Sequence, residues 1–111
     1  MAQFVEIDID QGTDFRLDLG LKNDDGTPKD VSGFIFSSSI KKSFYSLYEV
    51  ASFIVDDTNA DVGSVVLSLS AEVTSELKPG RYLFDVKQID VGNKVQRLAE
   101  GIVTVNPQIT A

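Results

Sequence analysis

The 111-residue sequence contains no cysteine and no histidine. Without cysteine there are no disulfides and no thiol chemistry, so the fold must rest on packing, and a reducing compartment is favoured. The absence of both residue types also excludes the usual zinc sites and the histidine-dependent catalytic triads. Any enzyme would have to work with Asp, Glu, Lys, Tyr or Ser alone.

Positive charge and long apolar runs are also scarce. Ten Lys and Arg residues stand against 17 Asp and Glu, which gives a net charge of −7. Nucleic-acid binding depends on clustered Lys and Arg, so a nucleic-acid partner is not expected. No apolar run approaches the roughly 18 residues of a membrane span. The acidic, alternating start MAQFVEIDID is unlike a signal peptide, so we expect no membrane partner either.

Alternation of apolar and polar residues is what the sequence has in abundance. Its clearest example covers residues 14–22, where Phe15, Leu17, Leu19 and Leu21 share one side, as in a half-buried strand. Further strands are expected over residues 4–9, 33–42, 51–57, 64–70, 81–90 and 94–106. In the 51–57 stretch two interpretations fit, one with Phe53 and Val55 inward and one with Ile54 inward.

About seven short strands without a long crossover helix predict an antiparallel sandwich or barrel in one domain, residues 1–111. Residues 71–77 read instead as a short helical crossing between two sheets. Ser70 is its expected N-cap, and Val73 and Leu77 are expected to face the rim of the core. A crossing of this kind favours the sandwich.

Pro79, Gly80 and Tyr82 follow the crossing directly. Their order resembles the tyrosine corner of immunoglobulin-like domains, in which the ring is buried and the hydroxyl bonds the backbone upstream. The alternative is a core tyrosine whose hydroxyl reaches water. We predict an antiparallel immunoglobulin-like β-sandwich of about seven strands with one short helical crossing.

One acidic turn has partial metal-ligand spacing. Asp57, Asn59 and Asp61 stand at alternate positions, as in a calcium-binding EF-hand loop. Such a loop needs glycine at its sixth position and a bidentate glutamate at its twelfth, where this chain has Val62 and Ser68. We interpret the segment as a solvated turn and predict no metal site.

The stretch SFYSLYE lacks strict alternation and crowds large side chains together: Phe44, Tyr45, Leu47 and Tyr48. One interpretation is an irregular strand or the rim of the core. The other is an exposed aromatic patch for a partner, since tyrosine contributes a large contact area at low entropy cost. These four residues are the candidate partner-binding residues.

Several pieces occur in one order along residues 11–110: QGTDFRLDLGLKNDDGTPKDVSGF, IKKSFYS, VVLSLSAEVTSELKPGRYLFDV and RLAEGIVTVNPQIT. The order resembles small structural proteins of tailed bacteriophages, including myoviruses of cyanobacteria. The layout is similar to the N-terminal immunoglobulin-like module of phage baseplate upper proteins. The matched motifs are a G-x-P-x-D turn at residues 26–33, the corner at 77–86 and a terminal strand at 98–107.

The resemblance implies a virion structural protein, assembled in the host cytoplasm, that attaches to larger virion proteins and could self-associate within the particle. It implies no catalysis, so we predict that the chain is not an enzyme and uses no cofactor. The long C-terminal extension of baseplate upper proteins is not seen, which leaves baseplate or tail, neck and capsid decoration all open. Two alternatives remain, a carbohydrate- or surface-binding adhesion module and a noncatalytic domain of an enzyme. For glycan binding, Tyr45 and Tyr48 would be the aromatic platforms.

Overall fold

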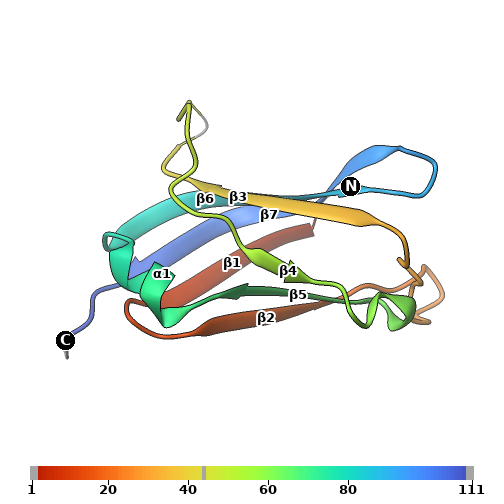
Figure 1. Ribbon diagram of the computed structural model, residues 1–111, viewed down its shortest axis with the longest axis horizontal. Coiled ribbons are helices and arrows are strands. Elements are labelled where there is room, and N and C mark those ends of the chain that lie inside the picture. Colours follow the sequence, from red (N-terminus) through yellow and green to blue (C-terminus); the bar gives the residue numbers. More distant parts are fainter. Residues whose placement is uncertain (1–2, 44, 110–111) are drawn as a thin grey trace.

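Two β-sheets pack face to face in the computed structural model, which describes residues 3–43 and 45–109 (Figure 1). One sheet has the order β1-β7-β6-β3 and the other β2-β5-β4. The strands are β1 (Gln3–Asp10), β2 (Phe15–Gly20), β3 (Ile35–Lys41), β4 (Ile54–Asp56), β5 (Ser64–Leu69), β6 (Gly80–Ile89) and β7 (Val95–Asn106). A 3-10 turn, η1 (Ala60–Val62), precedes β5, and the helix α1 (Ala71–Glu76) joins the two sheets. The predicted sandwich with one helical crossing is confirmed.

The pairing of the terminal strands differs from the antiparallel expectation. β1 runs parallel to β7, with Gln3 opposite Ala99 and Asp10 opposite Asn106, whereas the other paired strands are antiparallel within the described residues. A parallel pair needs a long connection between its strands, and the absence of a crossover helix argued against one. Here β2 to β6 together provide that connection, because the two strands lie at opposite ends of the chain.

Gly101 on β7 permits the close approach of β1. A Cβ atom at this position would overlap the backbone oxygen of Val5. The parallel pair therefore depends on a residue without a side chain at this point of the ladder.

The core lies between the sheets and is built from the inward positions of the alternating strands. Val5, Ile7 and Ile9 line it from β1, while Phe4 on the opposite side of that strand is 61% exposed. Of the two interpretations for residues 51–57, the structure has Phe53 buried and Ile54 63% exposed. Phe53 stands edge-on to Phe84 of the facing sheet, with ring centroids 5.6 Å apart.

The helical crossing begins as predicted, with the Ser70 hydroxyl accepting a hydrogen bond from the Val73 N–H at 3.3 Å. Leu77 is buried and Val73 packs against the core. The most buried residue of α1 is a polar one, Thr74, which the sequence analysis did not single out. Its hydroxyl accepts from the Gly12 N–H at 3.1 Å and donates to the Thr13 carbonyl at 2.7 Å.

Thr74 thereby links the two segments that cross between the sheets at this end, α1 and the turn between β1 and β2 (Figure 1). Two further contacts strengthen the link. The Ala71 N–H donates to the Asp14 carboxylate at 2.7 Å, and the Gln11 side chain donates to the Leu77 carbonyl at 3.0 Å. The crossing end of the sandwich is therefore a hydrogen-bonded unit that holds the corner before β6 in place.

Candidate binding surface

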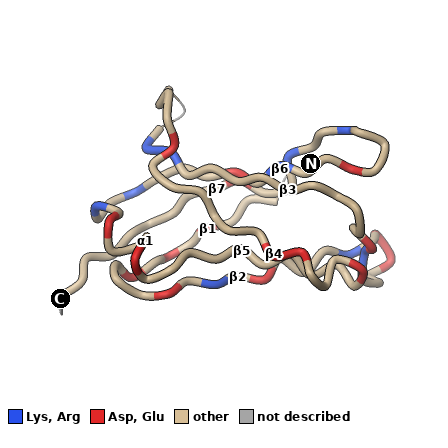
Figure 2. The backbone as a smooth tube through the Cα atoms, in the orientation of Figure 1, with Lys and Arg blue, Asp and Glu red and all other residues tan. Residues whose placement is uncertain are grey.

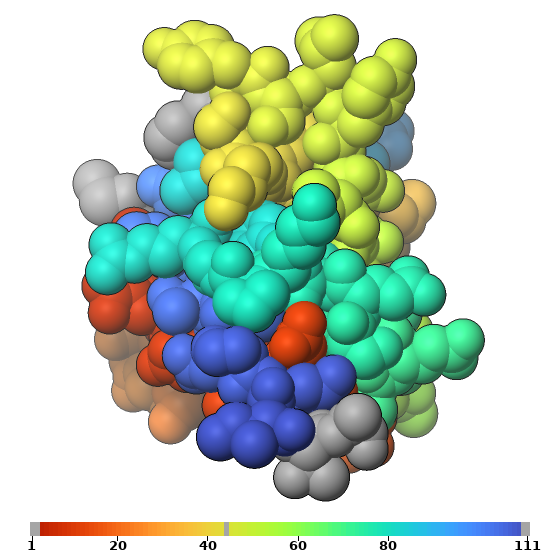
Figure 3. All heavy atoms as spheres, turned by 90° about the vertical axis from the view of Figure 1, so that its left-hand side faces the viewer, coloured from red at the N-terminus to blue at the C-terminus, as the bar shows by residue number. Residues whose placement is uncertain are grey.

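The aromatic loop, defined here as residues 43–50, connects β3 to the segment before β4. Three of its large side chains are almost fully exposed: Tyr45 at 94%, Leu47 at 85% and Tyr48 at 82%. The fourth candidate, Phe44, lies outside the described residues. Figure 3 shows the loop, in yellow, projecting beyond the body of the molecule. The exposure of these three residues agrees with the interpretation of the stretch as an exposed aromatic patch. It does not agree with the interpretation as a rim of the core.

Hydrogen bonds fix the base of the aromatic loop. The Ile40 N–H donates to the Ala51 carbonyl and the Val50 N–H donates back to the Ile40 carbonyl, both at 2.8 Å. The Ser39 hydroxyl donates to the Glu49 carboxylate at 2.7 Å. A loop with a fixed base and apolar side chains in solvent has a low entropy cost of binding, because its attachment is already ordered.

The tyrosine corner lies beside this base. Tyr82 is 5% exposed and its hydroxyl donates to the Lys78 carbonyl at 2.5 Å. Gly80 takes φ +139°, which a side chain would oppose, and Pro79 precedes it at the end of the crossing. The Lys42 ammonium lies 4.7 Å from the centre of the Tyr82 ring and donates to the Arg81 carbonyl at 3.2 Å. The corner hypothesis and the observed hydrogen bond agree, and Lys42 connects the corner to the aromatic loop.

A shallow hollow, called here the outer trough, lies on the face of the four-stranded sheet that points away from the core. Its volume is about 640 Å³, and Leu83, Ile102 and Phe4 supply apolar lining. A second hollow of about 260 Å³ shares Leu83 and Ile102 with it and is also lined by Tyr45 and Arg81. The trough and the aromatic loop therefore form one continuous surface.

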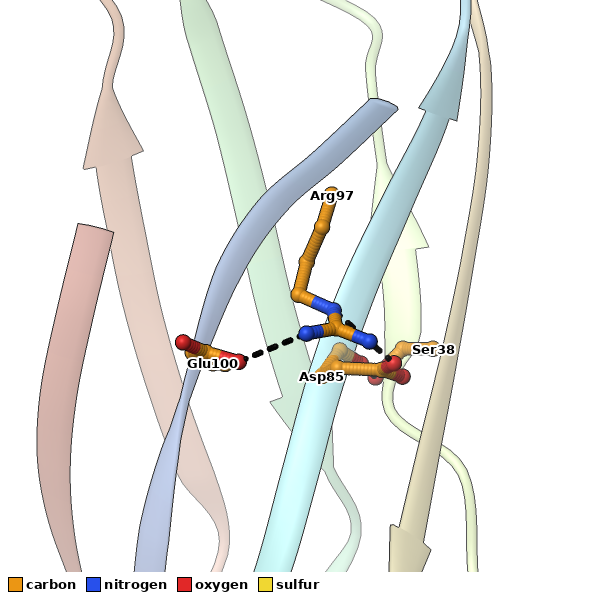
Figure 4. A network of polar contacts seen from close by, with 4 residues as sticks. All are labelled: Ser38, Asp85, Arg97 and Glu100. Atoms are coloured by element: carbon orange, nitrogen blue, oxygen red, sulfur yellow. Dashed lines mark hydrogen bonds and ion pairs between the residues drawn. The ribbon is translucent and has the colours of Figure 1, made fainter. Parts of the chain in front are cut away.

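Arg97 of β7 organises the charges in the outer trough (Figure 4). Its guanidinium lies between two acids, 2.9 Å from the Glu100 carboxylate and 3.6 Å from that of Asp85. The backbone carbonyl of Asp85 also accepts a hydrogen bond from the Ser38 hydroxyl at 3.0 Å. Because these side chains are partly exposed, the ion pairs contribute little stability, and the single charge of Arg97 offsets only one of the two acidic charges.

Cations of the same surface have no such partners. Lys41, Lys87 and Arg81 form no ion pair with an acid within residues 3–43 and 45–109. Figure 2 shows Lys and Arg gathered around the base of the aromatic loop, while Asp and Glu crowd the turns at the opposite end of the sandwich. Although the chain is acidic overall, this surface combines a cationic side with an apolar floor.

The acidic turns at the opposite end carry the spacing that was compared with a calcium loop. In the described part of the chain no three Asp or Glu residues converge as metal ligands. Hydrogen bonds within the turns occupy several of the carboxylates instead. The Asp56 carboxylate accepts from the Thr58 hydroxyl at 2.6 Å and from the Thr58 N–H at 3.0 Å. These two bonds hold the pKa of Asp56 below its ordinary value, and the bond from the Thr58 hydroxyl has the larger effect.

Asp25 and Asp30 repeat this arrangement. Hydrogen bonds from Thr27 lower the pKa of Asp25, and hydrogen bonds from Ser32 lower that of Asp30. A lowered pKa at an exposed turn indicates a carboxylate that caps its own loop. It does not provide the raised pKa that a general acid requires.

The structure brings Tyr45 close to the corner residues that the sequence analysis treated separately, because both line the smaller hollow beside Leu83. It also adds residues that sequence reasoning missed, namely Lys41, Arg81, Asp85, Lys87, Arg97 and Glu100. The alternation of β6 gave one usable signal, since Leu83, Asp85 and Lys87 share the side opposite the core. Their meeting with Arg97 depends on strand pairing.

Comparisons with known proteins identify the fold and no family. No protein-family model matches the chain, and no curated protein matches it. Among solved structures, the SrpA adhesin R347E mutant from Streptococcus sanguinis aligns with TM-score 0.55 and 12% identity. CopC from Methylosinus trichosporium OB3b aligns with TM-score 0.51 and 15% identity. The chain shares the β-sandwich fold of these proteins.

The extent of the two alignments differs. The adhesin match covers 92% of this chain and 55% of the adhesin chain, so this chain spans about half of that protein's length. The CopC match covers 100% of this chain and 90% of the other. At such low identity the likeness concerns the arrangement of strands alone. Within the described residues, no helix is long and apolar enough to cross a membrane.

Proposed function

We propose that the chain is a noncatalytic attachment module of a tailed-phage virion that binds larger virion proteins through the aromatic loop and the adjoining outer trough. The observation that carries the proposal is the exposure of Tyr45, Leu47 and Tyr48 on a loop whose base is fixed by hydrogen bonds. Exposed aromatic and aliphatic side chains that lie together typically become the centre of a protein interface.

The motif order along residues 11–110 supports the virion role through its resemblance to small phage structural proteins. Virions present many copies of each component, so a small module gains attachment strength by multivalency. The proposed location is the virion, and the proposed partners are its larger structural proteins, with no nucleic acid and no membrane involved. The proposal assigns no catalytic residue and no cofactor.

The first test is whether purified phage particles contain the chain, as mass spectrometry of their proteins would report. The second is reattachment of added chain to particles that lack it. Tyr45→Ala should weaken reattachment by about tenfold or more, as expected for a central interface residue, without changing the melting temperature. Val62→Ala is the matched control, because Val62 is 57% exposed at the opposite end of the sandwich.

Two results would refute the proposal. One is absence of the chain from particles, and the other is equal reattachment by the Tyr45 variant and the control.

A second candidate is a carbohydrate- or surface-binding adhesion module. The fold likeness to a domain of the SrpA adhesin favours it, together with two exposed tyrosines that could stack against sugar rings. A glycan array separates the candidates. Saturable binding to a defined glycan that Tyr45→Ala or Tyr48→Ala abolishes would support adhesion, and binding to virion proteins alone would support the first proposal.

A further inference from the structure

The joined surface, defined here as the outer trough together with the smaller hollow, has a charge opposite to that of the whole chain. Five of the ten Lys and Arg residues line it, with two of the 17 Asp and Glu residues. Its lining therefore has a net charge of +3, whereas the chain has −7. A surface with this charge attracts an acidic ligand and repels a basic one.

Three of the five cations are available to a ligand. Lys41, Arg81 and Lys87 form no ion pair with an acid within residues 3–43 and 45–109. Arg81 and Lys87 are exposed, and Lys41 is half-buried. The other two cations are held within the chain, one over the tyrosine corner and the other by the acids of the trough.

Strand register places the three available cations around an apolar centre. Leu83 of β6 stands opposite Lys41 on β3 and opposite Ile102 on β7. Arg81 precedes Leu83 by two residues, and Lys87 follows it by four. Alternate residues of a strand are about 7 Å apart, so the Cα atoms of Arg81 and Lys87 lie about 7 Å and about 13 Å from that of Leu83, on opposite sides of it. The side chains of an extended ligand have the same spacing.

Acids limit where a negative ligand can lie. Asp85 of β6 stands opposite Glu100, and Arg97 offsets only one of their two charges. A ligand side chain over this pair should therefore be neutral. Glu6 and Asp8 are exposed on β1, at the far side of β7. An acidic ligand is consequently repelled from β1 and favoured over β6 and β3.

We propose that the joined surface binds an extended acidic segment of a partner protein, which lies along β6. An apolar side chain of the segment packs on Leu83 and Ile102, and acidic side chains on either side of it meet Arg81 and Lys87. The inference rests on the proposed function in taking the outer trough as a protein-binding surface. The apolar centre favours a polypeptide over a nucleic acid or an anionic polysaccharide, because neither of these carries an aliphatic side chain between its charges.

The main measurement is an NMR titration of the full chain with a synthetic serine-rich peptide at up to about 1 mM, which detects weak complexes. The peptide carries one leucine, a glutamate two residues before it and another glutamate four residues after it. A second peptide with the reversed order tests the opposite direction along β6. The expected result is saturable binding of one of them that shifts the amide signals of Leu83 and Ile102. Raising the salt from about 0.05 M to about 0.5 M should weaken it about fivefold or more.

Substitutions in the chain test the two parts of the surface separately. Lys41→Gln/Lys87→Gln should weaken binding about fivefold or more, because two charges that face the ligand are lost. Lys22→Gln/Lys94→Gln is the matched control, since it removes the same charge from exposed positions that line neither hollow, and binding should persist. Leu83→Thr should also weaken binding about fivefold or more, because it removes the apolar contact. Melting temperatures confirm that each variant is folded.

Changes in the probe test the chemistry of the partner. Replacing both glutamates of the peptide by lysine, or its leucine by serine, should weaken binding to the same extent. Dextran sulfate tests an anionic polysaccharide. If it binds more tightly than both peptides and Leu83→Thr leaves that binding unchanged, a protein segment is the wrong partner.

Three further results would refute the proposal: no binding of either peptide, equal binding of the lysine peptide, and binding that Lys41→Gln/Lys87→Gln leaves unchanged. These results are separate from the test of the proposed function. If reattachment to particles depends on Tyr45 and the purified chain binds neither peptide, the proposed function stands and the acidic segment is wrong. If the chain binds the peptide as expected and particles lack the chain, the virion role is wrong and the acidic segment stands.

Discussion

Thr74 offers the sharpest test of how the crossing end of the sandwich is held together. Thr74→Val preserves the shape of this fully buried side chain and removes its hydroxyl, which bonds Gly12 and Thr13. A polar backbone group left without a partner costs about 1–3 kcal/mol. Gly12 is half-buried and Thr13 is exposed, so water replaces part of the loss. We expect destabilisation by about 1–2 kcal/mol, measured by urea unfolding.

Thr74→Ser is the matched control, because it keeps the hydroxyl and loses one methyl group, at a cost of about 0.8 kcal/mol. The two variants differ most in a local readout, the hydrogen exchange of the Gly12 amide. Exchange should accelerate in Thr74→Val and remain slow in Thr74→Ser. If the valine variant is as stable as the natural chain and its Gly12 amide stays protected, the reasoning is wrong.

Three further outcomes are expected. Tyr82→Phe should cost about 1 kcal/mol and Tyr82→Ala about 3–5 kcal/mol, both by urea unfolding, and a neutral phenylalanine variant would contradict the corner hydrogen bond. Gly101→Ala should cost at least about 1–3 kcal/mol and speed hydrogen exchange along β1, because its Cβ would strike the Val5 carbonyl, whereas unchanged exchange would contradict the parallel pairing. Thr58→Val should raise the pKa of Asp56 toward its ordinary value in an NMR titration. Because folding lowers the pKa of Asp56, the stability that this carboxylate contributes is present above its ordinary pKa and is lost as the pH falls through its pKa in the folded chain. An Asp56 pKa that is the same in Thr58→Val and in the natural chain would contradict the hydrogen bonding seen in this turn.

Local rules accounted for most of the elements. The side chain of a strand residue faces one sheet surface or the other with a period of two, so the inward set of β2 and the outward position of Phe4 follow from alternation alone. The N-cap at Ser70 and the corner at Tyr82 likewise involve partners within a few residues. Interactions between residues so close in the sequence can be predicted from the sequence itself.

The segment 51–57, which contains β4, could not be oriented by these local rules. Both Phe53 and Ile54 are apolar, so alternation allowed either to face inward. The facing sheet decided between them, because Phe84 receives the Phe53 ring edge-on and leaves Ile54 in solvent.

Composition, alternation and capping residues thus determined the all-β class, the single short helix and the exposed polar turns of this protein. The tertiary structure alone decided which strands became neighbours. It placed β1 parallel to β7, brought Arg97 between Asp85 and Glu100, and buried Thr74 against the turn at Gly12. The physical reason is that these contacts join residues whose meeting depends on how two sheets pack and in which order their strands pair. The trough beside the aromatic loop arises from the same strand order.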